Sequence, residues 1–292
     1  MSTTTRADRG AVLITGAAGG IGSATARRLD TLGFHVFAGV RKSSDGKRLQ
    51  REISTQITPV MLDITDDASI VQAAEAISKM VGHAGLVGLV NNAGFIVEGP
   101  IELIPMDEVR KQFEVNVIGQ IAVTRAFLPL LRQGHGRIIN IGAASGRITF
   151  PYLGILSASK TALESFTDAL RSELQPWRLS VSIIEPLGMQ TQIFEKAGAS
   201  AKQARQQIPE HLQQLYAPAL TAIGKALANQ RLDSPDLVVN AITHALSSPH
   251  PKTRYLVGRG AFVIALLRLL PDRIRDALIL RTYGLANIQP GS

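Results

Sequence analysis

The 292 residues include no cysteine. The chain therefore forms no disulfide, offers no thiolate nucleophile and binds no metal through sulfur. Its six histidines and its acidic residues do not fall at the spacing of metal ligands, so we expect no metal site.

Long hydrophobic runs are also missing. The longest apolar run, Ala261–Leu267, is followed by Arg268 and soon ended by Pro271, far short of the ~20 residues that a membrane-spanning helix needs. The first ten residues are polar and do not resemble a secretory signal. We therefore expect a soluble, cytoplasmic protein without a membrane span.

Positive charge is in excess, with a formal net charge of +8. It favours either plain solubility or acidic ligands such as phosphate, and the composition leaves both open. The basic residues are dispersed and form no stripe with aromatic residues, so we do not expect a nucleic-acid partner.

Apolar segments of strand length alternate with longer amphipathic segments. Strands are expected at Val12–Ile14, His35–Val40, Pro59–Leu62, Leu86–Val90, Arg137–Ile141, Leu179–Ile184 and Thr253–Val257, and helices at Ser23–Thr31, Asp67–Met80, Glu108–Leu131, Ser157–Leu174 and Pro235–Leu246. Continuous apolar strands that alternate with helices are typical of a parallel sheet covered on both faces. The sequence thus predicts a single α/β domain.

The chain is expected to divide into three regions. Residues 1–9 are expected to be flexible, 10–258 to form the main domain with helices at about 191–232, and 259–292 to be a helical extension of that domain. The extension reads as two short helices split at Pro271. Its apolar residues favour a helix that covers the domain edge, although a lip over an apolar cleft or a subunit contact would also explain them.

A glycine-rich turn follows the first expected strand. Gly16, Gly20 and Gly22 let the backbone approach a pyrophosphate closely, and Ile21 opens the helix whose positive end would face it. The alternative is a purely structural turn between strand and helix.

The end of the second expected strand distinguishes NAD from NADP. A carboxylate there would bind the ribose 2′-hydroxyl, whereas a cation accommodates a 2′-phosphate. Val40 stands at this place, followed by Arg41 and Lys42, which favours NADP(H). Alternatively, the two cations are simply solvated charges at a strand end.

Three motifs together resemble the short-chain dehydrogenase/reductase family: Thr15-Gly16-Ala17-Ala18-Gly19-Gly20-Ile21-Gly22, Asn91-Asn92-Ala93-Gly94, and Lys160 at the start of a helix. The resemblance covers about Gly10 to Thr191. It implies a Rossmann-like doubly wound parallel sheet and cofactor contacts from Asp63, Asn91, Gly94, Lys160 and Thr191. Asn91 could equally be structural.

The same resemblance exposes a departure at the catalytic positions. In the family a Tyr stands four residues before the Lys and a Ser thirteen before the Tyr, whereas this chain has Leu156 and Ala143. Asn116 and Lys160 are retained. Ser145 and Tyr152 could substitute for the missing hydroxyls, although Tyr152 could also be an aromatic residue of the cleft wall. The family's Pro-Gly after the sixth strand is here Pro186-Leu187-Gly188, where a side chain at Leu187 would restrict positive φ.

Three functions remain open. Leu156 and Ala143, with Phe150 and Ile155 nearby, predict an apolar pocket that suits an apolar small molecule. The chain could be an NADP(H)-dependent oxidoreductase of an imine or activated acceptor, a non-redox cyclase, isomerase or dehydratase, or a catalytically dead cofactor-binding protein. The resemblance also implies a homodimer or homotetramer that pairs through Glu108–Leu131 and Ser157–Leu174.

Overall fold

The computed structural model describes residues 9–191, 198, 208–229 and 231–288. Of the flexible N-terminus expected at residues 1–9, residues 1–8 therefore lie outside the described residues. Most of the segment between 192 and 207, where helices near the substrate were expected, also lies outside them.

Seven parallel strands form one sheet in the order β3-β2-β1-β4-β5-β6-β7. They are β1 (Ala11–Ile14), β2 (His35–Val40), β3 (Thr58–Met61), β4 (Gly88–Asn91), β5 (Arg137–Ile141), β6 (Ser180–Pro186) and β7 (Arg254–Val257). The expected strands at 35–40 and 137–141 have the observed bounds, and the others differ by a few residues. The predicted parallel sheet is confirmed.

Helices connect the strands and cover the sheet. They are α1 (Gly20–Thr31), α2 (Ser43–Glu52), α3 (Asp67–Val81), α4 (Met106–Phe113), α5 (Gly119–Gln133), α6 (Gly154–Glu173), α8 (Glu210–Ala228), α9 (Asp236–Ser247), α10 (Ala261–Leu267) and α11 (Asp272–Thr282). A π-helical turn, Glu114–Ile118, joins α4 to α5. The single helix expected over Glu108–Leu131 thus contains a π turn, and α2 was not among the expected helices.

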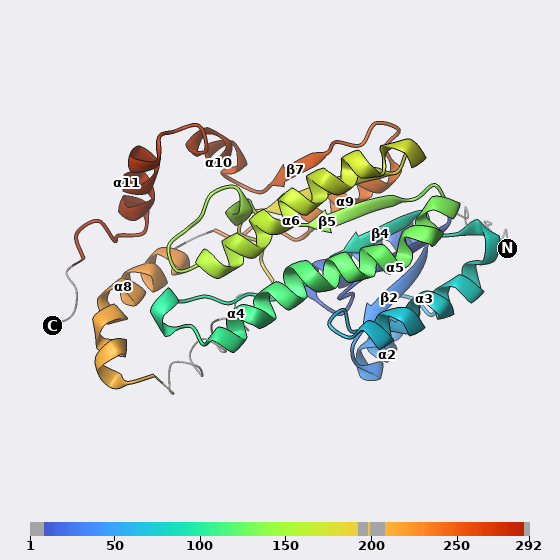
Figure 1. The fold of residues 1–292 in the computed structure, drawn as a ribbon, viewed down its shortest axis with the longest axis horizontal. Coiled ribbons are helices and arrows are strands. Elements are labelled where there is room, and N and C mark those ends of the chain that lie inside the picture. Colours follow the sequence, from blue (N-terminus) through green and yellow to red (C-terminus); the bar gives the residue numbers. More distant parts are fainter. Residues whose placement is uncertain (1–8, 192–197, 199–207, 230, 289–292) are drawn as a thin grey trace.

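Alternating strand residues face two cores. Val12 and Ile14 point toward the core that includes α1 and α9, and Leu13 points toward the core that includes α3, α5 and α6. Figure 1 shows α5 and α6 side by side over one face of the sheet. Both faces are covered, which explains why apolar strand residues point to both faces of the sheet.

The helix Met106–Gln133, which joins α4, the π turn and α5, is long and apolar enough to cross a membrane by length and composition. Its Phe127 and Leu131 are nevertheless fully buried in the core beside the sheet. This burial is typical of the core helix of a folded domain.

The C-terminal helices α10 and α11 lie with α8 at the end of the molecule toward which β4 and β5 point (Figure 1). Ile264 and Ile279 bury themselves against Ala144 and Ile148, beyond the carboxyl end of β5. The tail therefore covers the domain edge, and the expected split at Pro271 is confirmed.

Candidate active site

The strand order changes direction between the neighbouring strands β1 and β4. β2 and β3 lie on the β1 side, and β5, β6 and β7 lie on the β4 side. In open parallel sheets, ligands bind at the carboxyl ends of the strands beside such a reversal. The glycine-rich turn after β1 and the Asn-Asn-Ala-Gly segment after β4 both lie at this edge.

The glycine-rich turn is shaped by close backbone contacts. Gly16 has a φ of +61°, and a Cβ on it would come 2.9 Å from the Cα of Ala93. A Cβ on Gly22 would meet the carbonyl oxygen of Gly16 and, at 2.8 Å, the Nδ2 atom of Asn92. Side chains are therefore excluded from both positions, which leaves backbone N–H groups as the surface of the turn.

Helix α1 begins inside this turn. Its N-cap is Gly19, which has no side chain to accept the first amide protons, and its first turn contains no acidic residue. The positive end of the helix is thus available for an anion. Ile21 packs against the core beside β1, and Thr191 lies over the turn, with its Cγ2 atom 3.3 Å from the place of a Cβ on Gly20.

Asn92 holds the turn in place. Its Nδ2 atom donates to the carbonyl oxygens of Thr15 (2.9 Å) and Gly16 (3.1 Å). The Thr15 hydroxyl in turn accepts from the backbone N–H groups of Asn92 and Ala93, each at 3.0 Å. The two loops at the sheet edge are therefore fixed to one another, and this role of Asn92 was not predicted from the sequence.

Two exposed cations, Arg41 and Lys42, follow the buried Val40 at the end of β2. A third reaches the same region: Nη2 of Arg48 on α2 donates to the carbonyl oxygen of Ala18, at 3.0 Å. Arg48 was missed because α2 itself was not predicted. Three positive side chains near the glycine-rich turn fit a phosphate group on the adenosine ribose.

Asp63 and Asn91 differ in what they contact. The Oδ1 atom of Asp63 accepts from the N–H and the hydroxyl of Thr65, which shapes the loop after β3. Asn91 is fully buried, and its Nδ2 atom donates to Thr124 Oγ1 and Asn140 Oδ1, both at 2.9 Å. These contacts give the Asn91 side chain a structural role that joins β4, β5 and α5.

Asn116 lies in the π turn. Its side chain accepts from the N–H of Phe95 at 2.8 Å and donates to the carbonyl oxygen of Phe95 at 2.9 Å. Gln112 binds the same loop through Val97 N–H at 2.6 Å, and both amides reach Ser159 on α6. The loop beyond Gly94 is thereby tied to α6, through residues that the sequence analysis did not single out except Asn116.

Lys160 is buried beside the end of β5. Its Nζ atom donates to the carbonyl oxygen of Ile141 at 2.7 Å, and loss of hydration on burial lowers its pKa to about 8. Among the residues that the structure describes, Lys160 is therefore the only positively charged side chain that is buried in this part of the site.

Comparison with known proteins agrees with this geometry. Residues 10–202 match the family model of the short chain dehydrogenases. The chain is 37% identical over 280 residues to the 17-beta-hydroxysteroid dehydrogenase type 6 of Bos taurus, covering 93% of this chain and 88% of that protein. It is 36% identical over 278 residues to retinol dehydrogenase 5 of Mus musculus, covering 92% and 87%.

The chain belongs to the short-chain dehydrogenase/reductase family.

A solved family structure shows the same arrangement over nearly the whole chain. The short chain dehydrogenase of Burkholderia cenocepacia, determined in complex with NADP, superposes with a TM-score of 0.69 at 27% identity, covering 93% of this chain and 96% of that one. The resemblance first read from three motifs therefore extends from the sequence to the fold.

The two positions that the family pattern assigns to Tyr and Ser carry no hydroxyl. Leu156 lies in the first turn of α6, one turn before Lys160, and is buried against Ile96 and Leu153. Ala143 is extended and precedes the short turn Ala144–Gly146. Leu156 therefore belongs to an apolar cluster with Ile96 and Leu153.

The two candidate substitutes lie in different surroundings. Ser145 is buried, and its hydroxyl has no hydrogen-bond partner within the described residues. Tyr152 has a φ of +66°, which is rare for an aromatic residue, and its backbone oxygen accepts from Gly99 N–H at 2.8 Å. Burial raises the pKa of the Tyr152 phenol, so this group holds its proton at neutral pH.

The insertion of Leu187 changes the loop less than expected. The positive φ falls on Gly188 (+55°), and Leu187 keeps an ordinary backbone and donates to the carbonyl oxygen of Val257 at 2.8 Å. Its side chain joins the apolar cluster around Ala144 and Ile148. Leu187 thus avoids a positive φ, as a side chain there predicts, and the following glycine adopts it.

A buried ion network supports the turn that contains Ser145. Glu185 on β6 is fully buried and pairs with Arg147 Nε at 2.5 Å and Arg254 Nη1 at 2.7 Å. Arg254 also pairs with Glu164 on α6 at 3.0 Å. Burial and the nearby Glu185 charge raise the pKa of Glu164. Nothing in the sequence pattern indicated this network, because its members are far apart in the chain.

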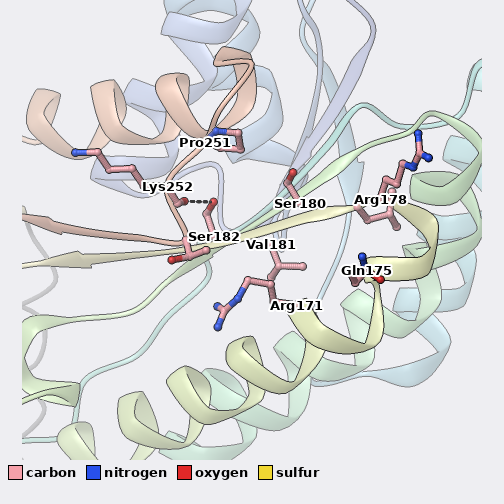
Figure 2. Close-up of a pocket in the computed structure, with 10 residues that line it drawn as sticks. Arg171, Gln175, Arg178, Ser180, Val181, Ser182, Pro251 and Lys252 are labelled. Atoms are coloured by element: carbon pink, nitrogen blue, oxygen red, sulfur yellow. Dashed lines mark hydrogen bonds between the residues drawn. The ribbon is translucent and has the colours of Figure 1, made fainter.

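A shallow cavity of about 280 Å³ lies at the amino-terminal edge of the sheet, beside the first residues of β6 and the residues that precede β7. Figure 2 shows that its three cations, Arg171, Arg178 and Lys252, direct their charged ends in different directions, while Ser182 donates to the Lys252 carbonyl oxygen at 2.7 Å. The charges do not converge on a ligand, so the cavity is not part of the candidate site.

Proposed function

We propose that this protein is an NADP(H)-dependent oxidoreductase that acts on an apolar small molecule whose reduction requires no proton from a Tyr or Ser. The observation that carries the proposal is a contrast within one site. The glycine-rich turn, the Asn92 contacts and the cations after β2 fit the cofactor, whereas Leu156 stands at the Tyr position.

The residues that would hold NADP(H) come from several elements. The turn of Gly16, Gly20 and Gly22 would bind the pyrophosphate, and Arg41 and Lys42 would bind the 2′-phosphate. Lys160 would donate to the ribose beside the nicotinamide, with Thr191 near the carboxamide. The bound cofactor supplies a hydride, and the NADP complex of the Burkholderia relative supports this choice of cofactor.

The chain's own residues determine which acceptors can react. An alkoxide would form if hydride reached a ketone, and neither Leu156 nor Ala143 can donate a proton or a hydrogen bond to it. A positioned general acid contributes about 10²–10⁴-fold, so ketone reduction should be slow. An iminium carbon needs no such donor, because hydride addition yields a neutral amine.

An apolar substrate fits both the site and the relatives. Leu156, Ile96 and Leu153 form an apolar cluster beside the reacting position, and such walls bind molecules with little polar surface. The relatives named above are a hydroxysteroid dehydrogenase and a retinol dehydrogenase. Their names support an apolar substrate class for this chain as well.

The test is NADPH consumption with matched pairs of cyclic imines and ketones of the same carbon skeleton. We expect turnover of the imines and little turnover of the ketones. Equal rates on both members of a pair would refute the proposed role of Leu156. Calorimetry with NADPH serves as the control, because it separates a wrong substrate class from a failure to bind cofactor.

The buried, apolar environment of Leu156 favours a second candidate, a cofactor-binding protein that no longer catalyses hydride transfer. Tight NADPH binding without turnover of any ligand would support it. Product formation from an apolar ligand without cofactor oxidation would instead support a cyclase, isomerase or dehydratase.

We also propose that the protein is a homodimer or homotetramer that pairs through α5 and α6, as the family resemblance implies. Analytical ultracentrifugation tests this, and a monomer at all concentrations would contradict it.

A further inference from the structure

The C-terminal arm, which we define as Gly260–Tyr283, exposes an unusual amount of apolar surface. The side chain of Phe262 is 75% exposed and that of Leu269 is 79% exposed. Other large apolar side chains of the arm are also exposed: Val263, Leu266, Ile274, Leu278 and Leu280. Single exposed apolar residues are ordinary, but a contiguous group usually marks an interaction surface.

The arm uses only one side of α10 for folding. Ile264 is buried against the domain with Leu267 beside it, whereas Phe262 and Leu266 are exposed on the other side of α10, and Leu269 is exposed in the turn that follows the helix. The anchoring of α10 therefore does not need these three residues. Their apolar character calls for a partner outside the domain.

Charges on the arm indicate what kind of partner this is. Arg268, Arg273 and Arg281 are exposed and have no ion pair within the described part of the chain. The two acidic residues of the arm, Asp272 and Asp276, both pair with Arg275, at 2.8 Å and 3.8 Å. The three arginines without an ion pair therefore leave the arm with a net positive charge, next to its exposed apolar side chains.

We propose that the C-terminal arm docks on the surface of a bilayer that contains anionic lipids. Apolar side chains on one side and arginines beside them are the composition of helices that lie in the membrane interface. A helix of seven residues is only about 10 Å long, so α10 lies on the bilayer and does not cross it.

A second copy of the chain fits the arm less well. A two-fold contact through the arm would place the same surface against itself, and the arginines without ion pairs would then approach one another. An anionic headgroup layer neutralises them instead. The proposal goes beyond the proposed function and holds whether or not the site turns over a substrate.

Docking would also orient the molecule. The inner residues of the arm contact Ala144 and Ile148 at the carboxyl edge of the sheet. A docked arm therefore holds this edge next to the bilayer, and because the strands are parallel, the glycine-rich turn after β1 lies at the same edge.

The experiment is flotation of the full-length protein with two kinds of vesicle: phosphatidylcholine alone, and phosphatidylcholine mixed with phosphatidylglycerol. We expect binding to the mixed vesicles, weakened by added salt. Phe262→Ser with Leu269→Ser should lower the partition coefficient at least about tenfold. Val71→Ser with Met80→Ser, which removes two exposed apolar side chains from α3, should leave it unchanged.

A second pair tests the charges. Arg268→Gln with Arg273→Gln should remove the preference for anionic vesicles, whereas Arg51→Gln with Lys79→Gln, which changes exposed cations elsewhere, should preserve it. Circular dichroism confirms that each variant is folded.

Two outcomes would overturn the proposal. One is the absence of binding to either vesicle by the folded parent protein. The other is a concentration-dependent dimer that Phe262→Ser with Leu269→Ser converts to monomer, because that result assigns the arm to self-association.

Discussion

Two parts of the carboxyl edge of the sheet differ in how closely they match the family pattern: the part after β1 and β2, which would hold the cofactor, and the part after β5, which would hold the substrate. After β1 and β2, each expected glycine and cation is present, and Asn92 fixes the glycine-rich turn. After β5, Lys160 donates to the Ile141 carbonyl oxygen, and Leu156 and Ala143 stand where the family spacing predicts two hydroxyl groups. The first part has the groups proposed to bind the cofactor, whereas the second is predicted to lack the usual acid.

This contrast is possible because the fold does not depend on the missing hydroxyls. The buried polar contacts that join the sheet to its helices run from Asn91 to Asn140 and from Asn140 to Thr167, at 2.9 Å and 2.8 Å. Leu156 instead packs against Ile96. Chemistry at the substrate edge can therefore change without loss of the sheet or of the cofactor site.

The sharpest test restores the missing groups. Ala143→Ser combined with Leu156→Tyr should raise ketone reduction by about 10²–10⁴-fold, because it returns a general acid and a hydrogen-bond donor. Steady-state kinetics with NADPH and a ketone measures the gain. The matched control, Ala143→Ser with Leu156→Phe, adds the ring without its hydroxyl. If both double variants have the same rate, Leu156 does not occupy the position of the acid.

Lys160 offers a test of the substrate edge through stability. Its pKa is lowered from 10.5 to about 8 by burial, so the unfolded chain holds this proton more tightly than the folded one. Stability should therefore rise as the pH increases from about 8 to 10.5. Urea unfolding should show the parent gaining up to about 3 kcal/mol relative to Lys160→Met between pH 7 and pH 10.

Lys79→Met is the control for this measurement, because Lys79 is exposed on α3. The difference in unfolding free energy between Lys79→Met and the parent should be the same at both pH values. If the difference in unfolding free energy between Lys160→Met and the parent is also the same at both pH values, Lys160 is hydrated in solution.

The cofactor edge should be most sensitive at its glycines. Gly22→Ala places a Cβ against the Gly16 carbonyl and the Asn92 amide, which should weaken NADPH binding by about a hundredfold, or about 2.7 kcal/mol. Isothermal titration calorimetry gives the dissociation constant. Gly224→Ala in α8 is the control, since a Cβ there meets nothing within 4 Å. Equal affinities for the two variants would remove the turn from the cofactor site.

The smallest expected effect concerns the choice between the two nucleotides. Arg41→Ser with Lys42→Ser should weaken NADPH binding by about tenfold and leave NADH binding nearly unchanged, because only NADPH carries the 2′-phosphate. Arg51→Ser on the exposed face of α2 should alter neither affinity. An equal loss of affinity for NADPH and NADH would mean that the two cations do not bind this phosphate.

The fold was predictable from the sequence where burial sets the pattern. β2 and β5 are mostly apolar and buried between polar segments, so their bounds were predicted directly. Helix α2 was missed because Gly46 and Leu49 are its only buried residues, and a single apolar position on a polar helix gives no periodic signal.

The site was predictable where a motif carries it and not where distant residues meet. Gly16, Gly22 and Lys160 follow recognisable spacing, whereas Arg48 reaches the Ala18 carbonyl only because α2 folds beside the turn. The ion network around Glu185 joins residues from three separate elements. The predicted lack of a proton donor at Leu156 and the roles of Ser145 and Tyr152 stay predictions.

The π turn at Glu114–Ile118 amounts to one residue more than a regular helix would accommodate. Removing a residue between Phe113 and Gly119 would rotate α4 by about 100° relative to α5. The amides of Gln112 and Asn116 could then no longer both face the backbone of Phe95. A lineage that lost this extra residue would keep a well-formed helix and lose the register on which the loop after β4 depends.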